Sequence, residues 1–376
     1  MIRIIVLLVL AVSSFGFFHP NHNNATNTWY KRSHTLPDSV KQKLDKMVKQ
    51  LATRDSCRMI AKIEFNKDVY YAGYDGRTNS IITDFSVPVE IGSCSKLYTA
   101  AAIHQLIEQK KFSLSSKLVD VLPNPTLYKH LLVIDSVDYI DSVTVLNLLN
   151  HTSGFPDYFM KDLHYELAAH GDSTLQFTPT QLITLAKRLK NPTFKTNEKW
   201  GYSNVNYVLL GMIIERVTGM PYQQYIQEHM LKPLGLHHTY FGSVNPPALR
   251  AAGFYNKKPV QMPATFAWSA GEMVVTLDDM TKFIDAWYLG KIFRNQSTTH
   301  AIQFDNMKDM GMGINYGMGS IRLKGKSWGH SGETFGSSSY MAALPNGSRF
   351  ALSIDDANVG NWLVAMDITE WLYALK

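Results

Sequence analysis

The sequence contains little cysteine: Cys57 and Cys94 are the only two among 376 residues. So few cysteines exclude a disulfide framework, although an exported protein could still form a single bridge. Cys94 directly follows Ser93 in a turn that we interpret as functional, so we expect two separate, mostly buried thiols. Clusters of cysteine and histidine at zinc-binding spacing are missing as well, and we therefore expect neither a metal site nor a cofactor.

The sequence also lacks a block of basic residues. It has 37 lysines and arginines against 31 aspartates and glutamates, for a formal net charge of +6, but these residues are dispersed. Without a basic patch or stripe a nucleic-acid partner is not expected, and the positive excess indicates a scattered surface charge. The composition, 45% hydrophobic and 18% charged, is that of a globular protein with a large core.

A long apolar run is missing except at the N-terminus. Arg3 precedes the apolar residues 4–12, and Ser14-Phe15-Gly16 places small residues where a signal peptidase reads them. We predict a signal peptide over residues 1–16 and a polar, flexible leader over 17–37. Residues 4–18 are shorter than the ~20 apolar residues of a spanning helix, so we expect an exported protein, periplasmic or extracellular, with no membrane span after cleavage.

The rest of the chain alternates between strand-like and helical patterns. Alternation predicts strands over 59–65, 69–74, 316–322, 327–330, 338–344 and 350–355. Helical spacing predicts helices over 38–52, 144–149, 178–189, 204–218, 221–230, 277–287 and 361–375, and a helix from Ser93 to Lys110. Strands near both ends with helices between them indicate an α+β fold.

The segment Gly92-Ser93-Cys94-Ser95-Lys96 carries the first candidate chemistry. Ser93 and Lys96 are three residues apart at the predicted start of a helix, where positions i and i+3 share one face. Serine is a poor nucleophile until a nearby group accepts its proton, and a lysine held neutral can do so. The spacing therefore predicts a serine nucleophile with a lysine beside it.

Two later segments make this pattern specific: Gly201-Tyr202-Ser203-Asn204 and Gly329-His330-Ser331-Gly332. The order Ser-x-x-Lys, Tyr-x-Asn and a basic residue followed by Ser/Thr-Gly resembles the serine β-lactamase and penicillin-binding protein superfamily. Within it, the Tyr-x-Asn form resembles the branch of class C β-lactamases, DD-peptidases and related esterases. The likeness extends from about Asp38 to the C-terminus, with further support at 148–154, 269–271 and 276–280.

This resemblance implies a fold and a domain order. The implied fold is an α/β sandwich of the β-lactamase/transpeptidase type, in which helices flank an antiparallel sheet. The sheet domain is expected from residues 38–111 and 262–376, and a mainly helical domain, 112–261, is inserted between them. The active site is expected in the groove between the two domains.

The resemblance also implies a role for each motif residue. Ser93 is the nucleophile, and its backbone N–H and that of Glu333 form the oxyanion hole. Lys96 and Tyr202 are both candidates for the general base, and the two titrate as a unit. Asn204 orients Lys96. The expected substrate-binding groups are Asn204, His330, Ser331, Gly332 and Glu333.

Three residues depart from the family pattern. His330 stands where β-lactamases usually carry lysine, and an imidazole binds a carboxylate less firmly than an ammonium, so an efficient β-lactamase is not expected. Glu333 and Glu272 stand where relatives often have a glycine. Glu333 either points into the groove, where it would repel an acidic substrate, or points away along its strand.

We therefore predict a secreted serine hydrolase that forms an acyl-enzyme with a small molecule or a cell-wall peptide. A D-alanyl-D-alanine carboxypeptidase acting on peptidoglycan peptides fits export and the histidine of the third motif. The alternatives are an esterase or a D-amino-acid amidase or peptidase with the same site, and a non-catalytic penicillin-fold protein that binds wall peptides. Tyr158 and Phe159 are candidates for the acyl-side pocket, and His151 is expected to fix the loop 150–154.

Overall fold

The computed structural model describes residues 35–159, 175–189, 194–261 and 263–375. The predicted signal peptide (1–16) and the predicted leader, apart from residues 35–37, lie outside the described residues. Over the described part of the chain, no helix is both long enough and apolar enough to cross a membrane.

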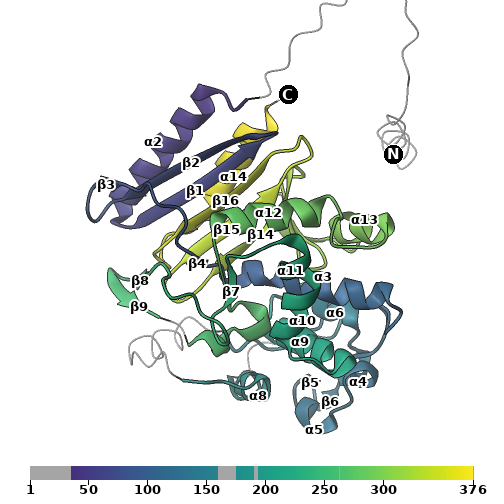
Figure 1. Ribbon diagram of the computed structural model, residues 1–376. Coiled ribbons are helices and arrows are strands. Elements are labelled where there is room, and N and C mark those ends of the chain that lie inside the picture. The colour runs from purple at the N-terminus through teal and green to yellow at the C-terminus, as the bar shows by residue number, and fades with distance from the viewer. Residues whose placement is uncertain (1–34, 160–174, 190–193, 262, 376) are drawn as a thin grey trace, which may run out of the picture. The chain divides into compact units, whose positions relative to one another are not determined.

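A large antiparallel sheet joins the early and late parts of the described chain (Figure 1). Strand β1 (Arg58–Phe65) pairs with β16 (Arg349–Ile354), with Ala61 opposite Leu352. The described strands of this sheet follow the order β11 (Lys308–Gly311), β12 (Ile314–Tyr316), β13 (Ile321–Leu323), β14 (Ser327–Glu333), β15 (Ser338–Ala343), β16, β1, β2 (Asp68–Asp75) and β3 (Ser80–Ile81). The smaller sheets contain β4 (Val89–Glu90), β10 (Met273–Val275) and β7 (Thr239–Phe241), the pair β5 (Val133–Ile134) and β6 (Val137–Asp138), and the pair β8 (Gly253–Tyr255) and β9 (Lys258–Val260).

Many of the described helices lie between β4 and β10 along the chain, and in Figure 1 the helices α3, α6, α9 and α10 gather below the sheet. The described helices are α2 (Asp38–Asp55), α3 (Ser95–Glu108), α4 (Leu118–Val121), α5 (Pro125–Tyr128), α6 (Val145–Leu149), α8 (Pro179–Leu189), α9 (Asn204–Thr218), α10 (Tyr222–Ile226), α11 (Lys232–Leu234), α12 (Leu277–Tyr288), α13 (Gln296–Phe304) and α14 (Trp362–Tyr373).

Helices cover both faces of the sheet because side chains alternate along each strand. On β1, Met59, Ala61 and Ile63 belong to an apolar cluster that also contains buried residues of α2 and α14. Ile60 points to the other face and belongs to the cluster that contains buried residues of α3 and α12. The sheet is therefore a middle layer, and α3 is held against one of its faces.

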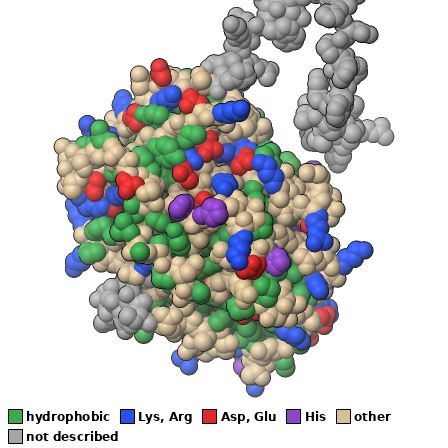
Figure 2. Space-filling view, viewed as in Figure 1, with side chains coloured by type: hydrophobic (Ala, Val, Ile, Leu, Met, Phe, Trp, Pro, Cys, Tyr) green, Lys and Arg blue, Asp and Glu red, His purple; other side chains and the backbone are tan. Residues whose placement is uncertain are grey.

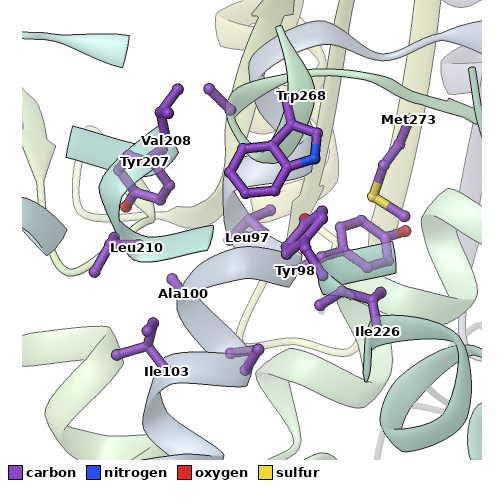
Figure 3. Packing of buried hydrophobic residues seen from close by; sticks show 14 of the residues in the cluster. Leu97, Tyr98, Ala100, Ile103, Tyr207, Val208, Leu210, Ile226, Trp268 and Met273 are labelled. Atoms are coloured by element: carbon purple, nitrogen blue, oxygen red, sulfur yellow. The ribbon is translucent and has the colours of Figure 1, made fainter. Parts of the chain in front are cut away.

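Helix α3 is buried along most of its length, which fixes the position of its first turn. Leu97, Tyr98 and Ile103 are each 0% exposed. Figure 3 shows these side chains among Val208 of α9 and Trp268, which belong to the same cluster. Close packing of this kind leaves little freedom for a residue at the start of the helix to move.

The predicted α+β class, an antiparallel sheet flanked by helices, is confirmed. The strand predicted over 316–322 is wrong, because Gly317 N donates to Ser320 O in a turn that separates β12 from β13. The predicted helix over 221–230 is observed as α10 followed directly by a π-helical segment, Gln227–Leu231. The domain boundaries at residues 112 and 261 stay predictions.

Surface charge is dispersed on the face seen in Figure 2. Basic and acidic side chains are interspersed there, and no block of one sign stands out. For this face, the picture agrees with the scattered charge expected from the sequence.

Candidate active site

The first motif forms a tight turn pressed against strand β14. Gly92, Ser93 and Cys94 make a 3-10 turn that leads directly into α3. Gly92 has φ 48°, and a Cβ at this position would lie 2.6 Å from the carbonyl oxygen of Glu333 and 2.7 Å from its nitrogen. Only glycine fits such a close approach at positive φ. The turn that carries Ser93 and the backbone of Glu333 therefore lie side by side.

Ser93 Oγ receives hydrogen bonds from both candidate bases. Lys96 Nζ donates at 3.0 Å, and the Tyr202 hydroxyl donates at 2.9 Å. Lys96 also donates to Asn204 Oδ1 and to the carbonyl of Ala270, each at 2.7 Å. The structure thus brings Ser93, Lys96, Tyr202 and Asn204 into one hydrogen-bonded cluster, in which Ser93 and Tyr202 stay partly exposed.

Burial separates the protonation behaviour of the two candidate bases. It lowers the pKa of the Lys96 ammonium to about 7, opposed by the Asp157 carboxylate and the Cys94 thiol. It raises the pKa of the Tyr202 phenol well above its usual value, an effect that the hydrogen bond to Ser93 opposes. Near neutral pH a large fraction of Lys96 is therefore a neutral amine, which donates its two N–H groups to Asn204 Oδ1 and Ala270 O and turns its lone pair toward Ser93 Oγ, whereas Tyr202 keeps its proton.

His330 of the third motif is connected to His151 by hydrogen bonds through Tyr316, and all three side chains are buried. The Tyr316 hydroxyl lies 3.1 Å from Nε2 of His151 and 3.1 Å from Nε2 of His330. Ser203 N–H donates to Nδ1 of His151 at 3.2 Å, and Asn206 Nδ2 lies 2.9 Å from the same atom. His151 therefore carries its proton on Nε2 and donates to Tyr316. Its contacts tie the loop 150–154 to the start of α9, as expected.

His330 is neutral and both of its ring nitrogens are engaged within the protein. Tyr316 donates to Nε2 of His330, and Nδ1 donates to the carbonyl of Ser331. Burial and the nearby Lys96 lower the pKa of His330 to about 3. A neutral imidazole with both nitrogens engaged offers no fixed cation to a substrate carboxylate. Its role in substrate binding stays a prediction.

The remaining predicted residues line a cleft of about 530 Å3 beside Ser93. Along β14, Ser331 is half-buried and Glu333 is exposed. A Cβ on Gly332 would lie 1.9 Å from the carbonyl oxygen of Ile91, so this close approach also requires glycine. Much of the lining is aromatic and includes the expected pair: Tyr158, Phe159, Trp200, Tyr255, Phe335 and Trp362.

The two unusual glutamates have different surroundings. Glu272 is buried, and its carboxylate accepts hydrogen bonds from Gln223 Nε2 at 2.8 Å and from the Ser243 hydroxyl. Burial raises the pKa of Glu272 to about 7. Glu333, in contrast, is exposed and lines the cleft. Of the two, only Glu333 lies where it can face a substrate in this cleft.

The motifs did not predict Asp157, which lines the cleft next to Tyr158. Its carboxylate accepts from the Asn204 N–H at 3.0 Å, from Asn204 Nδ2 at 3.0 Å and from the Phe159 N–H at 3.2 Å. Burial raises the pKa of Asp157 to about 6, against these hydrogen bonds. The available signal was its position three residues after the end of the supporting segment 148–154.

Neither thiol competes with Ser93. Cys57 and Cys94 are both free and buried, as expected. Cys94 Sγ donates to the carbonyl of His330 at 3.0 Å, and burial raises the pKa of this thiol to about 12. Its thiolate is therefore scarce at neutral pH. Over the described ranges, no group of three or more His, Cys, Asp or Glu residues is placed to hold a metal ion.

Comparisons with known proteins agree on a family. A family model described as "Beta-lactamase" matches residues 63–359. The Bacillus subtilis protein named "Putative penicillin-binding protein PbpX" is 26% identical over 296 residues, which cover 77% of this chain and 67% of that protein. A Salmonella agona protein named "Putative D-alanyl-D-alanine carboxypeptidase" is 26% identical over 265 residues, which cover 65% of this chain and 57% of that protein. The match thus spans little more than half of the Salmonella protein.

Solved structures share the fold. A D-stereospecific amidohydrolase from a Streptomyces species superposes with a TM-score of 0.70 at 25% identity, over 88% of this chain and 95% of that one. The D-amino acid amidase of Ochrobactrum anthropi superposes with a TM-score of 0.72 at 22% identity, over 87% of this chain and 98% of that one. The predicted β-lactamase/transpeptidase-like fold is confirmed.

Proposed function

The chain belongs to the beta-lactamase family, and from that premise we propose that it is a serine hydrolase that forms an acyl-enzyme on Ser93. The observation that carries the proposal is the double contact of Ser93 Oγ, 3.0 Å from Lys96 Nζ and 2.9 Å from the Tyr202 hydroxyl. A serine in contact with a buried lysine, at the edge of a cleft, is arranged to lose its proton. This intact arrangement gives no support to a purely wall-binding protein.

In the proposed acylation, neutral Lys96 accepts the Ser93 proton while Oγ attacks the carbonyl carbon of the substrate. The backbone N–H groups of Ser93 and Glu333 stabilise the negative charge that develops on the carbonyl oxygen. Collapse of the intermediate breaks the bond to the leaving group, which departs with the proton held by Lys96. Water then attacks the acyl ester while Lys96 accepts its proton. The bond between the carbonyl carbon and Oγ breaks, Lys96 returns the proton to Oγ, and the acid is released.

Tyr202 acts in this scheme as a neutral hydrogen-bond donor. Burial keeps its phenol protonated, so it does not compete with Lys96 for the Ser93 proton near neutral pH. Its hydroxyl contacts Ser93 Oγ, the atom that becomes the ester oxygen and later the leaving group of deacylation. A donor at this atom stabilises the charge that returns to Oγ when the acyl group is released.

We propose that the substrate is an amide or ester of a D-amino acid with a neutral leaving group. His330 supports this choice, because it stands at the position of the family's cation and is held neutral with both nitrogens engaged. A C-terminal carboxylate on the leaving group would find no fixed positive charge there. The D-stereospecific amidohydrolase from Streptomyces is similar over nearly its whole length and supports the same substrate class.

A D-alanyl-D-alanine carboxypeptidase acting on wall peptides is the second candidate. It is favoured by the name of the Salmonella agona relative, which matches 65% of this chain. Both candidates act on small molecules or wall peptides outside the cytoplasm, and we propose export on the basis of the N-terminal residues 1–16.

Hydrolysis of matched substrates tests the proposal. The mature protein and its Ser93→Ala variant are assayed with D-phenylalanine amide, p-nitrophenyl butyrate and diacetyl-L-lysyl-D-alanyl-D-alanine. We expect Ser93-dependent hydrolysis in which the best neutral substrate exceeds the tripeptide in kcat/KM. A preference for the tripeptide would make the carboxypeptidase the better assignment. Hydrolysis that survives in Ser93→Ala would contradict the nucleophile.

A further inference from the structure

Asp157 lies outside the three motifs, but it is hydrogen-bonded to Asn204, which in turn is hydrogen-bonded to the candidate base Lys96. Its carboxylate accepts two hydrogen bonds from Asn204, one from the backbone N–H and one from the side-chain Nδ2, both at 3.0 Å. Asn204 is the first residue of α9, so the carboxylate lies at the positive end of the helix dipole. A third N–H, that of Phe159, donates to the same carboxylate at 3.2 Å.

The contact with Asp157 determines which way the Asn204 amide faces. An amide has one donor end and one acceptor end, and the donor end is committed to the carboxylate. The acceptor, Oδ1, is therefore turned toward Lys96 Nζ, 2.7 Å away. If the amide rotated by half a turn, Nδ2 would face the Lys96 donors and Oδ1 would face the carboxylate, and both contacts would become repulsive.

Lys96 depends on this orientation because it is 0% exposed and cannot reach water for its hydrogen bonds. Its donors go to Ser93 Oγ at 3.0 Å, Asn204 Oδ1 at 2.7 Å and the carbonyl of Ala270 at 2.7 Å. Loss of the Asn204 acceptor would leave a buried ammonium short of one partner and free its Nζ to move away from Ser93.

We infer that Asp157 is a positioning residue that, through the amide of Asn204, holds Lys96 in place to take the proton of Ser93. This inference rests on the proposed function only for its kinetic consequences, since the hydrogen bonds exist without turnover. Asp157 acts through Asn204, which donates to its carboxylate and accepts from Lys96.

The charge of Asp157 also acts on Lys96. Among the described residues, the titratable groups near Lys96 include Cys94, His151, Tyr202, Tyr207 and His330. Burial lowers the pKa of both histidines and raises that of the thiol and both phenols, so these five groups are uncharged near neutral pH. Asp157, with a pKa of about 6, is then a negative neighbour that stabilises the Lys96 ammonium.

The test replaces the carboxylate by an amide of the same shape, Asp157→Asn. The titration of Lys96 is followed by NMR in protein labelled with 13C at lysine Cε, and the Lys96 signal is assigned by its absence in Lys96→Arg. We expect the titration midpoint of Lys96 to fall by about one pH unit, because a nearby opposite charge has been removed. An unchanged midpoint would overturn the charge effect.

Asp279→Asn is the matched control for a carboxylate that serves only the fold. Asp279 is buried in the first turn of α12, where it accepts from His238 N–H at 2.7 Å and from the Thr239 hydroxyl at 2.9 Å. Its replacement is expected to lower the melting temperature while the Lys96 midpoint stays unchanged. An equal shift in both variants would mean a general loss of structure and would overturn the inference.

A double-mutant comparison tests whether Asp157 acts through Asn204. We expect Asp157→Asn to lower kcat tenfold or more with a smaller change in KM, but to have less than a twofold effect in an Asn204→Ala background. An equal fold loss of kcat in the wild-type and Asn204→Ala backgrounds would overturn the inference that Asp157 acts through Asn204. The NMR titration requires no substrate, so an inactive wild-type protein would contradict the proposed function while the midpoints still decide the role of Asp157.

Discussion

The hydroxyl of Tyr316 lies 3.1 Å from Nε2 of His330 and fixes the tautomer of that ring. Nδ1 of His330 donates to the carbonyl of Ser331, so Nε2 of this neutral ring is an acceptor and the Tyr316 hydroxyl donates to it, while His151 donates to the same hydroxyl. The third motif is therefore part of a buried, directional network, with a neutral imidazole where β-lactamases usually carry lysine.

Removal of the Tyr316 hydroxyl should destabilise the protein. In Tyr316→Phe, the Nε2–H of His151 loses its acceptor and Nε2 of His330 loses its donor. Buried polar groups without partners cost about 1–3 kcal/mol each, so we expect a loss of at least about 1 kcal/mol in the free energy of unfolding, measured with urea. Tyr340→Phe is the control, because the Tyr340 hydroxyl is buried without a hydrogen-bond partner. A loss as large in the control would contradict this account.

Stability should fall as the solution becomes acidic, in part because of His330. Its pKa is about 3 in the folded protein against an ordinary value of 6.5. Above the ordinary value both folded and unfolded states are neutral, and below it only the unfolded chain takes up the proton, so stability is lost as pH falls. Between about pH 7.5 and 5 this one group accounts for about 2 kcal/mol.

Urea unfolding at several pH values checks this effect with His330→Gln. The variant is expected to lose less stability than the wild type over the same pH interval, whatever its stability at neutral pH. The exposed His237→Gln is the matched control and should keep the wild-type pH dependence. Identical slopes for wild type and His330→Gln would show that His330 is not the group responsible.

The pH dependence of turnover should identify the base. With a neutral ester, kcat/KM is expected to rise with pH and level off above about pH 7, because Lys96 accepts a proton only when it is neutral and its pKa is about 7. Lys96→Arg, which keeps the charge, should lose at least about a hundredfold in kcat. A profile that still rises above pH 10 would instead indicate the phenolate of Tyr202 as the base, because the pKa of this phenol is raised well above its usual value.

The turn before Ser93 should not accept a side chain. In Gly92→Ala the new Cβ would lie 2.6 Å from the Glu333 carbonyl oxygen, so the two N–H groups of the proposed oxyanion hole must separate. We expect kcat to fall about a hundredfold or more, by analogy with the loss of one oxyanion donor.

Gly219→Ala is the matched control for Gly92→Ala. Gly219 has φ 70° and no atom within 4 Å of a built Cβ, so it carries the same kind of backbone strain at the end of α9 without a clash. This variant should lose stability by about 1 kcal/mol and keep its kcat. An equal loss of kcat in the two glycine variants would mean that backbone strain, and not the position of Glu333, limits turnover.

The sequence predicted the parts of the site that depend on local spacing. Ser93 and Lys96 share a helix face, and Tyr202 and Asn204 flank the start of another helix, so their motifs are readable along the chain. The hydrogen bonds of Tyr316 and Asp157 join segments far apart in the sequence, and neither residue stands in a motif. Their roles arise only when β12 and the loop after residue 154 pack against α9.

The strand prediction failed for a similar physical reason. Residues 316–322 have a strand-like composition, but Gly319 adopts φ 89° and lets the chain turn between Tyr316 and Ile321. The fold class could be predicted because alternation at both ends and helical spacing between them are averaged over many residues. A turn depends on a few backbone angles, which composition does not specify.

The mass of the intact protein during reaction tests the central claim most directly. The mature protein is mixed with a fluorescent penicillin or a p-nitrophenyl ester, quenched in acid after increasing times and weighed, with Ser93→Ala treated in parallel. We expect the wild type to gain the mass of one acyl group, located by peptide mapping to Ser93, and the variant to gain none. An equal adduct on the variant, or a wild-type adduct that peptide mapping locates at a residue other than Ser93, would contradict an acyl-enzyme on Ser93.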